Sequence, residues 1–247
     1  MKKIKQIIKS LIMQEKASSE KYVAYLEKQG VQCGMDIIVY TPAHTIIDIT
    51  APYLLSIGNH VRITHGVIIL THDYSWSVLK SLEDSTAQQG RIFGAQSPVR
   101  IGNNVFIGMN AIIMRGVTVG DNVVIGAGSV ITKDCEPNSV YAGNPARRIM
   151  SIEEYRMKRD SAQFAEAKTM AHEYFKRYGK KPCMEEFREY FMLFCDAQMA
   201  ANVPAFKSQM MTSDNYAESV VYMNAHKPMF SCYDDFLRAC FADNQEN

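Results

Sequence analysis

The sequence of 247 residues predicts a mainly β protein with helical ends, in which short parallel strands stack into a narrow coil. Three observations support this fold class. An apolar residue occurs at every sixth position in the middle of the chain, glycine or asparagine follows three positions later, and the flanks have helical apolar spacing. We expect a helical segment over residues 1–30, the coil over 31–150 and a helical region over 151–247.

The N-terminal segment has the spacing of an amphipathic helix. Lys9 interrupts its apolar run, which is too short for the core of a signal peptide or for a membrane span, so we expect a cytoplasmic protein without membrane insertion. The apolar residues at helical intervals are Ile4, Ile7, Ile8, Leu11 and Ile12.

A repeat of six residues predicts the coil. Its apolar positions are Ile101, Ile107, Ile113, Val119, Ile125 and Ile131. The third residue after each of the first five is always asparagine or glycine, at Asn104, Asn110, Gly116, Asn122 and Gly128. These residue types enter the left-handed region of the backbone map at the lowest steric cost, so each short strand is expected to end in a tight turn.

The same repeat extends toward the N-terminus and is then interrupted. Ile57, Ile63 and Ile69 stand six apart, but residues 73–98 have no sixfold register. We therefore predict a long loop over 73–98 that leaves the coil. The irregular, β-rich residues before Ile57 are expected to cap the first turn of the coil.

The C-terminal region begins with a signal for a helix. Ser151 and Glu154 form a capping-box pattern, and Gly179 is expected to end the helix after Tyr178. An aromatic stripe follows, for which core packing is the favoured interpretation. Its members are Phe187, Tyr190, Phe191 and Phe194.

Charge and cysteine content exclude several classes of protein. Lys and Arg total 27 against 26 Asp and Glu, so the formal charge of +1 gives no global field that would attract nucleic acid or an anionic membrane. The six cysteines are scattered without metal-ligand spacing, which favours reduced thiols and predicts that no metal is required.

Over roughly residues 37–149 the repeats resemble those of the hexapeptide-repeat acyltransferases. The segment THDYSW, residues 71–76, resembles the one that carries the catalytic histidine in the maltose, galactoside and streptogramin acetyltransferases. Residues 127–149, AGSVITKDCEPNSVYAGNPARRI, resemble their closing coil. The resemblance implies a left-handed β-helix, acetyl-CoA as the acyl donor, and a homotrimer with active sites between neighbouring β-helices.

His72 is the candidate catalytic residue, because it matches the family's histidine and because transfer of an acyl group to a hydroxyl needs a base at neutral pH. It also occupies the corner position three residues after Ile69, so a role in a turn is the alternative. His60 occupies the same position after Ile57, where the coil simply continues. We favour catalysis for His72 and a turn for His60.

The resemblance also implies a set of residues along the path of coenzyme A. For the two arginines, an ordinary place on the solvated surface is an equal alternative to a contact with phosphate. The implied residues are Met109, Ala127, Thr132, Lys133, Arg147 and Arg148.

The acceptor side is predicted from position alone. The segment TPAHTIID, residues 41–48, lacks the asparagine that galactoside-type relatives use for the sugar. Trp76 has the chemistry of an apolar platform for a ring, although it could equally anchor the loop. The candidate acceptor residues are Asp73, Trp76, His44 and Asp48.

The leading hypothesis is transfer of an acetyl group from acetyl-CoA to a hydroxyl of a sugar or glycan precursor. One alternative keeps this chemistry with an antibiotic as acceptor. A second is a γ-carbonic-anhydrase-like metal site, for which His60 and His65 have a suggestive spacing. A third is a non-catalytic β-helix whose helical tail recruits a partner.

Assembly into a homotrimer is also expected from apolar side chains assigned to the outside of the coil, which are Val99, Phe106, Val124 and Val140. In the expected trimer, the loop 73–98 closes a cleft shared with the neighbouring subunit. His72 and Lys133 from different chains would then flank one coenzyme A.

Overall fold

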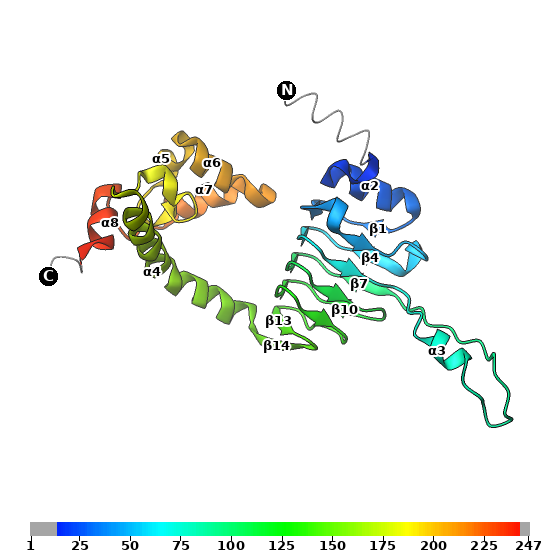
Figure 1. Ribbon diagram of the computed structural model, residues 1–247. Helices are drawn as coiled ribbons and strands as arrows, with labels where there is room; N and C mark the ends of the chain where they lie inside the picture. The colour runs from blue at the N-terminus through cyan, green and yellow to red at the C-terminus, as the bar shows by residue number, and fades with distance from the viewer. Residues whose placement is uncertain (1–13, 243–247) are drawn as a thin grey trace. The chain divides into compact units, whose positions relative to one another are not determined.

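The computed structural model describes residues 14–242 (Figure 1) and divides into two compact units, residues 1–155 and 156–247. The expected helix over residues 4–12 lies outside the described residues. The first unit opens with the 3₁₀ helix η1 (Gln14–Ala17) and helix α2 (Ser19–Gln29). Helix α2 begins at the N-cap Ser18, whose side chain accepts a hydrogen bond from Lys21 N, and ends at Gly30 in the left-handed conformation.

The strands of the first unit form three sheets. The first sheet has the order β1 (Gln32–Cys33), β4 (Leu55–Ile57), β7 (Val99–Ile101) and β10 (Thr118–Val119). The second has the order β2 (Ile38–Val39), β5 (Val61–Ile63), β8 (Val105–Ile107), β11 (Val123–Ile125), β13 (Ser139–Gly143) and β14 (Ala146–Ser151). The third has the order β3 (Ile46–Ile47), β6 (Ile68–Ile69), β9 (Ile112–Ile113) and β12 (Val130–Ile131).

Successive strands enter the first, second and third sheets in turn, so the chain winds as a three-sided coil (Figure 1). Each strand pairs in parallel with the strand one coil earlier, for example Ile113 of β9 with Ile69 of β6 and Ile131 of β12 with Ile113. The antiparallel pairing of β13 with β14 closes the stack. The predicted parallel coil is therefore confirmed.

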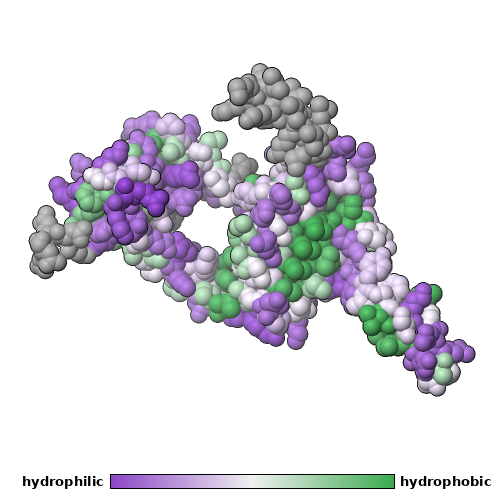
Figure 2. Space-filling model, in the orientation of Figure 1, coloured by the Kyte–Doolittle hydropathy of each residue, from purple (hydrophilic) through white to green (hydrophobic). Residues whose placement is uncertain are grey.

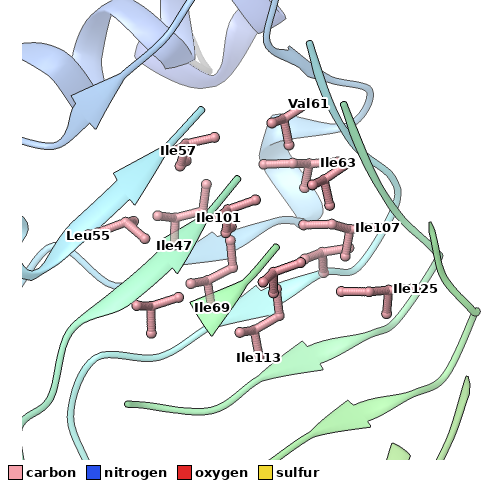
Figure 3. Close-up of a cluster of buried hydrophobic side chains, with 14 of the residues drawn as sticks. Ile47, Leu55, Ile57, Val61, Ile63, Ile69, Ile101, Ile107, Ile113 and Ile125 are labelled. Carbon is pink, nitrogen blue, oxygen red and sulfur yellow. The ribbon is translucent and has the colours of Figure 1, made fainter. Parts of the chain in front are cut away.

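The sixfold apolar residues fill the inside of this coil (Figure 3). Ile63, Ile69, Ile107, Ile113 and Ile125 are completely buried. Because parallel strands stack about 4.8 Å apart, aligned isoleucines of consecutive coils contact one another in continuous columns. Burial of these columns supplies the main stabilisation of the coil.

The corners of the coil have the backbone that the sequence predicts. The φ angles of the five corner residues are 53° at Asn104, 58° at Asn110, 80° at Gly116, 56° at Asn122 and 68° at Gly128. All five lie in the left-handed region, which confirms the interpretation of the repeat. His60 joins them with φ 56°, whereas His72 is absent from the positive-φ residues of the described chain.

The outer surface of the coil differs in part from the prediction. Val99 is 0% exposed, so its assignment to the outside was wrong. It aligns with Leu55, which fills the same interior column two residues before an inward isoleucine. Val140 is also buried, with Met150 of the added strand β14 paired beside it, whereas Phe106 is exposed as expected.

Apolar side chains still gather on the visible surface of the coil (Figure 2). The third sheet carries an outward row in register, in which Ile46 is 55% exposed and the other three members are half-buried. We name it the third-sheet ladder; its members are Ile46, Ile68, Ile112 and Val130.

The predicted loop over residues 73–98 leaves the coil between β6 and β7 (Figure 1). Its two ends pair at the base, where Asp73 N donates to Ala95 O at 2.9 Å and Ser97 N donates to Thr71 O at 3.0 Å. The loop contains the short helix α3 (Trp76–Lys80). Because the base is held by backbone hydrogen bonds, the residues beside it, including His72, have a defined position.

Three 3₁₀ turns complete the described connections of the chain, η2 and η3 in the first unit and η6 in the second. They are η2 (Pro42–His44), η3 (Pro52–Leu54) and η6 (Thr212–Asp214).

Helix α4 (Ile152–Tyr178) has the predicted capping box and end. Glu154 N donates to Ser151 Oγ at 3.1 Å, and Ser151 N donates to the Glu154 carboxylate at 2.6 Å. Gly179 follows with φ 65°. No described helix is both long and apolar enough to cross a membrane.

The second unit has its own aromatic core, which includes the buried rings of Phe187, Phe194, Phe206 and Phe236. Three residues of the predicted aromatic stripe, Phe187, Phe191 and Phe194, are buried as expected, and Tyr190 is half-buried. The stripe lies on and beside two short 3₁₀ helices rather than on one α-helix. The elements are η4 (Met184–Phe187), η5 (Phe191–Leu193), α5 (Ala197–Asn202), α6 (Pro204–Met210), α7 (Tyr216–Ala225) and α8 (Tyr233–Cys240).

Candidate active site

The corner that follows the third sheet gathers polar side chains from successive coils. Thr71, Arg115 and Lys133 each lie two residues after one of the aligned isoleucines of β6, β9 and β12. Asp48 directly follows β3, one coil before His72. We name this row, formed by Asp48, Thr71, His72, Arg115, Thr132 and Lys133, the His72 edge.

His72 and Asp48 form a close pair on this edge. The distance between His72 Nδ1 and Asp48 Oδ2 is 2.5 Å. Because an ionised carboxylate only accepts hydrogen bonds, Nδ1 carries the hydrogen and the neutral ring keeps a lone pair on Nε2. The arrangement therefore fixes one tautomer of the imidazole and leaves Nε2 able to accept a hydrogen bond.

Asp48 is buried, with only 4% of its side chain exposed. Its carboxylate also accepts hydrogen bonds from Thr71 Oγ1 at 2.6 Å, Thr71 N at 2.9 Å and Thr50 N at 2.9 Å. Burial by itself raises the pKa of Asp48, but the hydrogen bonds from Thr71 and Thr50 outweigh it and hold the pKa well below its usual range. The structure thus turns Asp48 toward His72, although the sequence placed it among the acceptor residues.

Aromatic residues of the loop border the histidine. The ring of Tyr74 meets the His72 ring edge-on, with centroids 4.9 Å apart, and Trp76 lies 5.9 Å beyond Tyr74. Together with Asp73 and residues 93–96, these side chains line a cavity of about 190 Å³. The cavity thus brings together three of the predicted residues, His72, Asp73 and Trp76, and adds Tyr74.

Asp73 is held by two neighbours. Its carboxylate accepts a hydrogen bond from Ser75 N at 2.7 Å, and Arg115 Nε lies 3.7 Å from its second oxygen. The hydrogen bonds from Ser75, aided by the charge of Arg115, lower the pKa of Asp73. Arg115 was missed in the sequence, where the signal was its position two residues after Ile113, equivalent to Lys133 after Ile131.

The other predicted residues lie on different parts of the coil. Met109 and Ala127 occupy the corner between the second and third sheets, the opposite edge of the third sheet from His72. His44 lies on the same corner, and its ring centroid is 4.8 Å from that of His65. We name this row, formed by His44, His65, Met109 and Ala127, the His44 edge.

Arg147 and Arg148 lie on β14 and are exposed. Arg148 Nε is 3.9 Å from a carboxylate oxygen of Glu136, and Arg147 donates to Ala146 O. Their side chains are thus on the closing strand of the second sheet, while Lys133 lies on the His72 edge.

In the described part of the chain, no three His, Cys, Asp or Glu side chains form a group suited to a metal ion. His60 and His65, the pair considered for a γ-carbonic-anhydrase-like site, lie on different corners of the coil. His60 Nδ1 is 2.6 Å from Asp36, and His65 Nδ1 is 3.2 Å from Thr41 Oγ1.

Comparison with known proteins identifies relatives of the coil. Residues 98–133 match the family model described as the hexapeptide repeat of succinyl-transferase. Protein CapG of Staphylococcus aureus is 45% identical over 133 residues, which are 54% of this chain and 73% of CapG. The galactoside O-acetyltransferase of Escherichia coli K12 is 37% identical over 108 residues, 44% of this chain and 48% of that enzyme.

Among solved structures, galactoside acetyltransferase in complex with coenzyme A is 29% identical, with a TM-score of 0.38, over 54% of this chain and 70% of that one. The chain spans about half the length of the E. coli galactoside O-acetyltransferase. The helical unit lies outside residues 98–133, which match the family model.

Proposed function

This chain belongs to the hexapeptide-repeat acetyltransferases, and we propose that it transfers the acetyl group of acetyl-CoA to a hydroxyl of a sugar or glycan precursor. The observation that carries the proposal is the buried Asp48 that holds His72 Nδ1, so that Nε2 is the free proton acceptor. The sugar as acceptor class is supported by the name of the galactoside O-acetyltransferase relative.

In the proposed reaction His72 is the general base. Nε2 removes the proton of the acceptor hydroxyl as its oxygen forms a bond to the thioester carbonyl carbon. When the carbon–sulfur bond breaks, the same nitrogen returns that proton to the departing sulfur. The products are the O-acetyl ester and free coenzyme A, and no covalent acyl-enzyme is needed.

Asp48 acts as the positioning residue for His72. It keeps the ring in the tautomer that accepts at Nε2, and its negative charge stabilises the positive charge that develops on the imidazole during proton transfer. The low pKa of Asp48 keeps the carboxylate ionised at neutral pH, as this role requires.

The donor is proposed to lie along the His72 edge. Arg115 and Lys133 occupy equivalent positions on two consecutive coils, so their cations are about one strand spacing apart along the coil axis. Such a row suits the phosphates of coenzyme A. Thr132 lies beside Lys133 on the same edge, and Asp73 and Trp76 border the cavity on the acceptor side.

We further propose a left-handed coil that assembles as a homotrimer. Within one chain the third-sheet ladder separates the His72 edge from the His44 edge, which holds Met109 and Ala127. When two copies associate, the His72 edge of one can lie against the His44 edge of the other. The association would also cover the third-sheet ladder, which is partly exposed to solvent in a single copy. The expectation that His72 and Lys133 come from different chains is replaced, because both lie on one edge of one chain.

The reaction is assigned to the cytoplasm. All six cysteines are free thiols, including the exposed Cys183 and Cys232, which is typical of a reducing compartment.

The test is an acceptor screen with acetyl-CoA, read as release of the coenzyme A thiol and by mass spectrometry of the product. The panel contains galactosides, maltose, N-acetylhexosamines, their oligosaccharides and chloramphenicol. We expect O-acetylation of a saccharide, and light scattering should report three copies. Exclusive acetylation of chloramphenicol, or of an amine, would contradict the proposed acceptor class.

A further inference from the structure

The helical unit contains a cavity that the acetyl-transfer reaction does not use. Its volume is about 820 Å³, within the usual range for small-molecule sites and larger than the cavity beside His72. Its walls come from α4, η5, α6, α7 and the segment 226–229. These elements lie close together in Figure 1.

One wall is a platform of two stacked rings. Tyr222 and His226, one helical turn apart, have ring centroids 4.0 Å apart and an interplanar angle of 17°. His226 Nδ1 is 2.9 Å from Tyr222 O. Since a carbonyl oxygen only accepts, Nδ1 carries the hydrogen and Nε2 of the neutral ring can accept one from a ligand. Tyr222 is 63% exposed, so this platform is open to a ligand.

The remaining polar lining is rich in planar hydrogen-bonding groups. Carboxylates and side-chain amides can pair with neighbouring hydroxyl groups, each of which both donates and accepts. Gln163 and Asp160 already form such a pair, with Gln163 Nε2 donating to Asp160 Oδ1 at 3.4 Å. The lining groups of this kind are Asp160, Gln163, Gln209, Asn215 and Glu218.

The charges of the cavity disfavour other ligand classes. The lining contains two carboxylates, Asp160 and Glu218, and one ammonium group, Lys227, so a phosphate or nucleotide would meet more negative than positive charge. A purely aliphatic chain would pack on Met210 and Met223 but would bury the amides and carboxylates without partners. A neutral ligand with hydroxyl groups and an apolar ring face satisfies both parts of the lining.

From this combination we infer that the helical unit binds a saccharide in this cavity, with one ring lying on the Tyr222–His226 platform and its hydroxyls on the carboxylates and amides. The inference rests on the proposed function only for its biological meaning, which is retention of the acceptor glycan or of its acetylated product. Binding itself needs neither acetyl-CoA nor His72.

The experiment measures binding of neutral hexasaccharides (maltohexaose, cellohexaose and chitohexaose) to the full-length chain by saturation-transfer NMR and calorimetry, without acetyl-CoA. Inorganic phosphate and decanoate are comparison ligands. Tyr222→Ala should weaken saccharide binding about tenfold, because it removes the exposed ring of the platform. Glu218→Gln should weaken it several-fold.

The matched control is Tyr178→Ala, which removes another exposed tyrosine (59%) that contacts a ring one helical turn away, Tyr174, but lies outside the cavity lining. It should leave binding unchanged, and circular dichroism should show all variants folded. Equal loss in both variants, absence of saccharide binding, or preferential binding of phosphate or decanoate would overturn the inference.

His72→Ala separates this inference from the proposed function, because it should abolish acetyl transfer and retain saccharide binding. Saccharide binding without acetyl transfer in the native chain would remove the proposed reaction and leave the cavity assignment standing.

Discussion

The coil contains two histidine–aspartate pairs that look alike, one at His72 and one at His60. In each pair the partners are 24 residues apart in sequence, and the Nδ1–Oδ2 distances are 2.5 Å for His72–Asp48 and 2.6 Å for His60–Asp36. The two pairs nevertheless differ in charge, in burial and in the backbone that carries the histidine. The difference supports the assignment of the proposed base to His72 rather than to His60.

At His60 the negative charge of the partner carboxylate, Asp36, is already balanced by a cation. The guanidinium of Arg62 lies 2.7 Å from Asp36 Oδ2 and 3.2 Å from His60 Nδ1. Although partial burial raises the pKa of Asp36, the contacts with Arg62 and His60 outweigh it and lower the pKa. The positive charge of Arg62 opposes the formation of a second positive charge on the imidazole of His60. This pair is therefore suited to holding the corner of the coil in place rather than to proton transfer.

At His72 the carboxylate is satisfied by neutral donors, Thr71 and Thr50, and is buried, whereas the Asp36 side chain is 34% exposed. A buried negative charge with neutral neighbours stabilises a developing imidazolium more strongly than a screened one. His72 also opens onto the loop cavity and lacks the positive φ of the other corner residues. Electrostatic surroundings, and not the pair itself, distinguish the two sites.

The largest expected effect separates the two histidines directly. His72→Asn should lower turnover about 10²- to 10⁴-fold, the usual contribution of a positioned general base. His60→Asn should leave turnover nearly unchanged, because asparagine occupies the same positive-φ corner slot in other coils. Both are measured as release of the coenzyme A thiol. Similar losses in the two variants would remove the distinction.

A smaller effect is expected at the carboxylates. Asp48→Asn should lower turnover about 10- to 100-fold with little change in the KM for acetyl-CoA, because an amide cannot accept from Thr50, Thr71 and His72 together. Asp36→Asn is the matched control and should change turnover less than about threefold. Steady-state kinetics of both variants decide whether the buried carboxylate positions the base.

The low pKa of Asp48 predicts a pH dependence of stability. Because the folded pKa of Asp48 lies below its ordinary value of 3.8, its contribution to stability is present above that value and is lost as pH falls through the folded pKa. The difference in melting temperature between the native chain and Asp48→Asn should therefore shrink on acidification below about pH 4. A constant difference from neutral to acid pH would contradict an ionised Asp48.

The smallest effect tests the positive-φ backbone of the corners, which His60 has and His72 lacks. Gly116→Val places a β-branched residue at φ 80° and should destabilise the coil by about 1–3 kcal/mol, lowering the melting temperature by several degrees. Gly94→Val, at a loop glycine with open space around it and no positive φ, is the control and should be neutral. Equal stability of both variants would show that corner strain is unimportant.

The coil could be predicted from the sequence alone, because the sixfold apolar period with asparagine or glycine at the corners is a local pattern that recurs in each repeat. The sequence also predicted the long loop 73–98 and the cap of α4, for which Ser151 and Glu154 suffice. His72 was singled out through its family motif, and its role as base remains a proposal.

Which side chains of different coils contact one another became clear from the three-dimensional fold. Asp48 contacts His72 because the register between two coils brings them together, and no short segment encodes that register. Val99 and Arg115 instead follow local rules, which are strand alternation before Ile101 and the repeat position that Lys133 also occupies. The saccharide cavity, like the His72–Asp48 pair, depends on tertiary packing, here of separate helices around Tyr222. Local periodicity thus predicted the scaffold, whereas the electrostatics of the site came from contacts between residues distant in sequence.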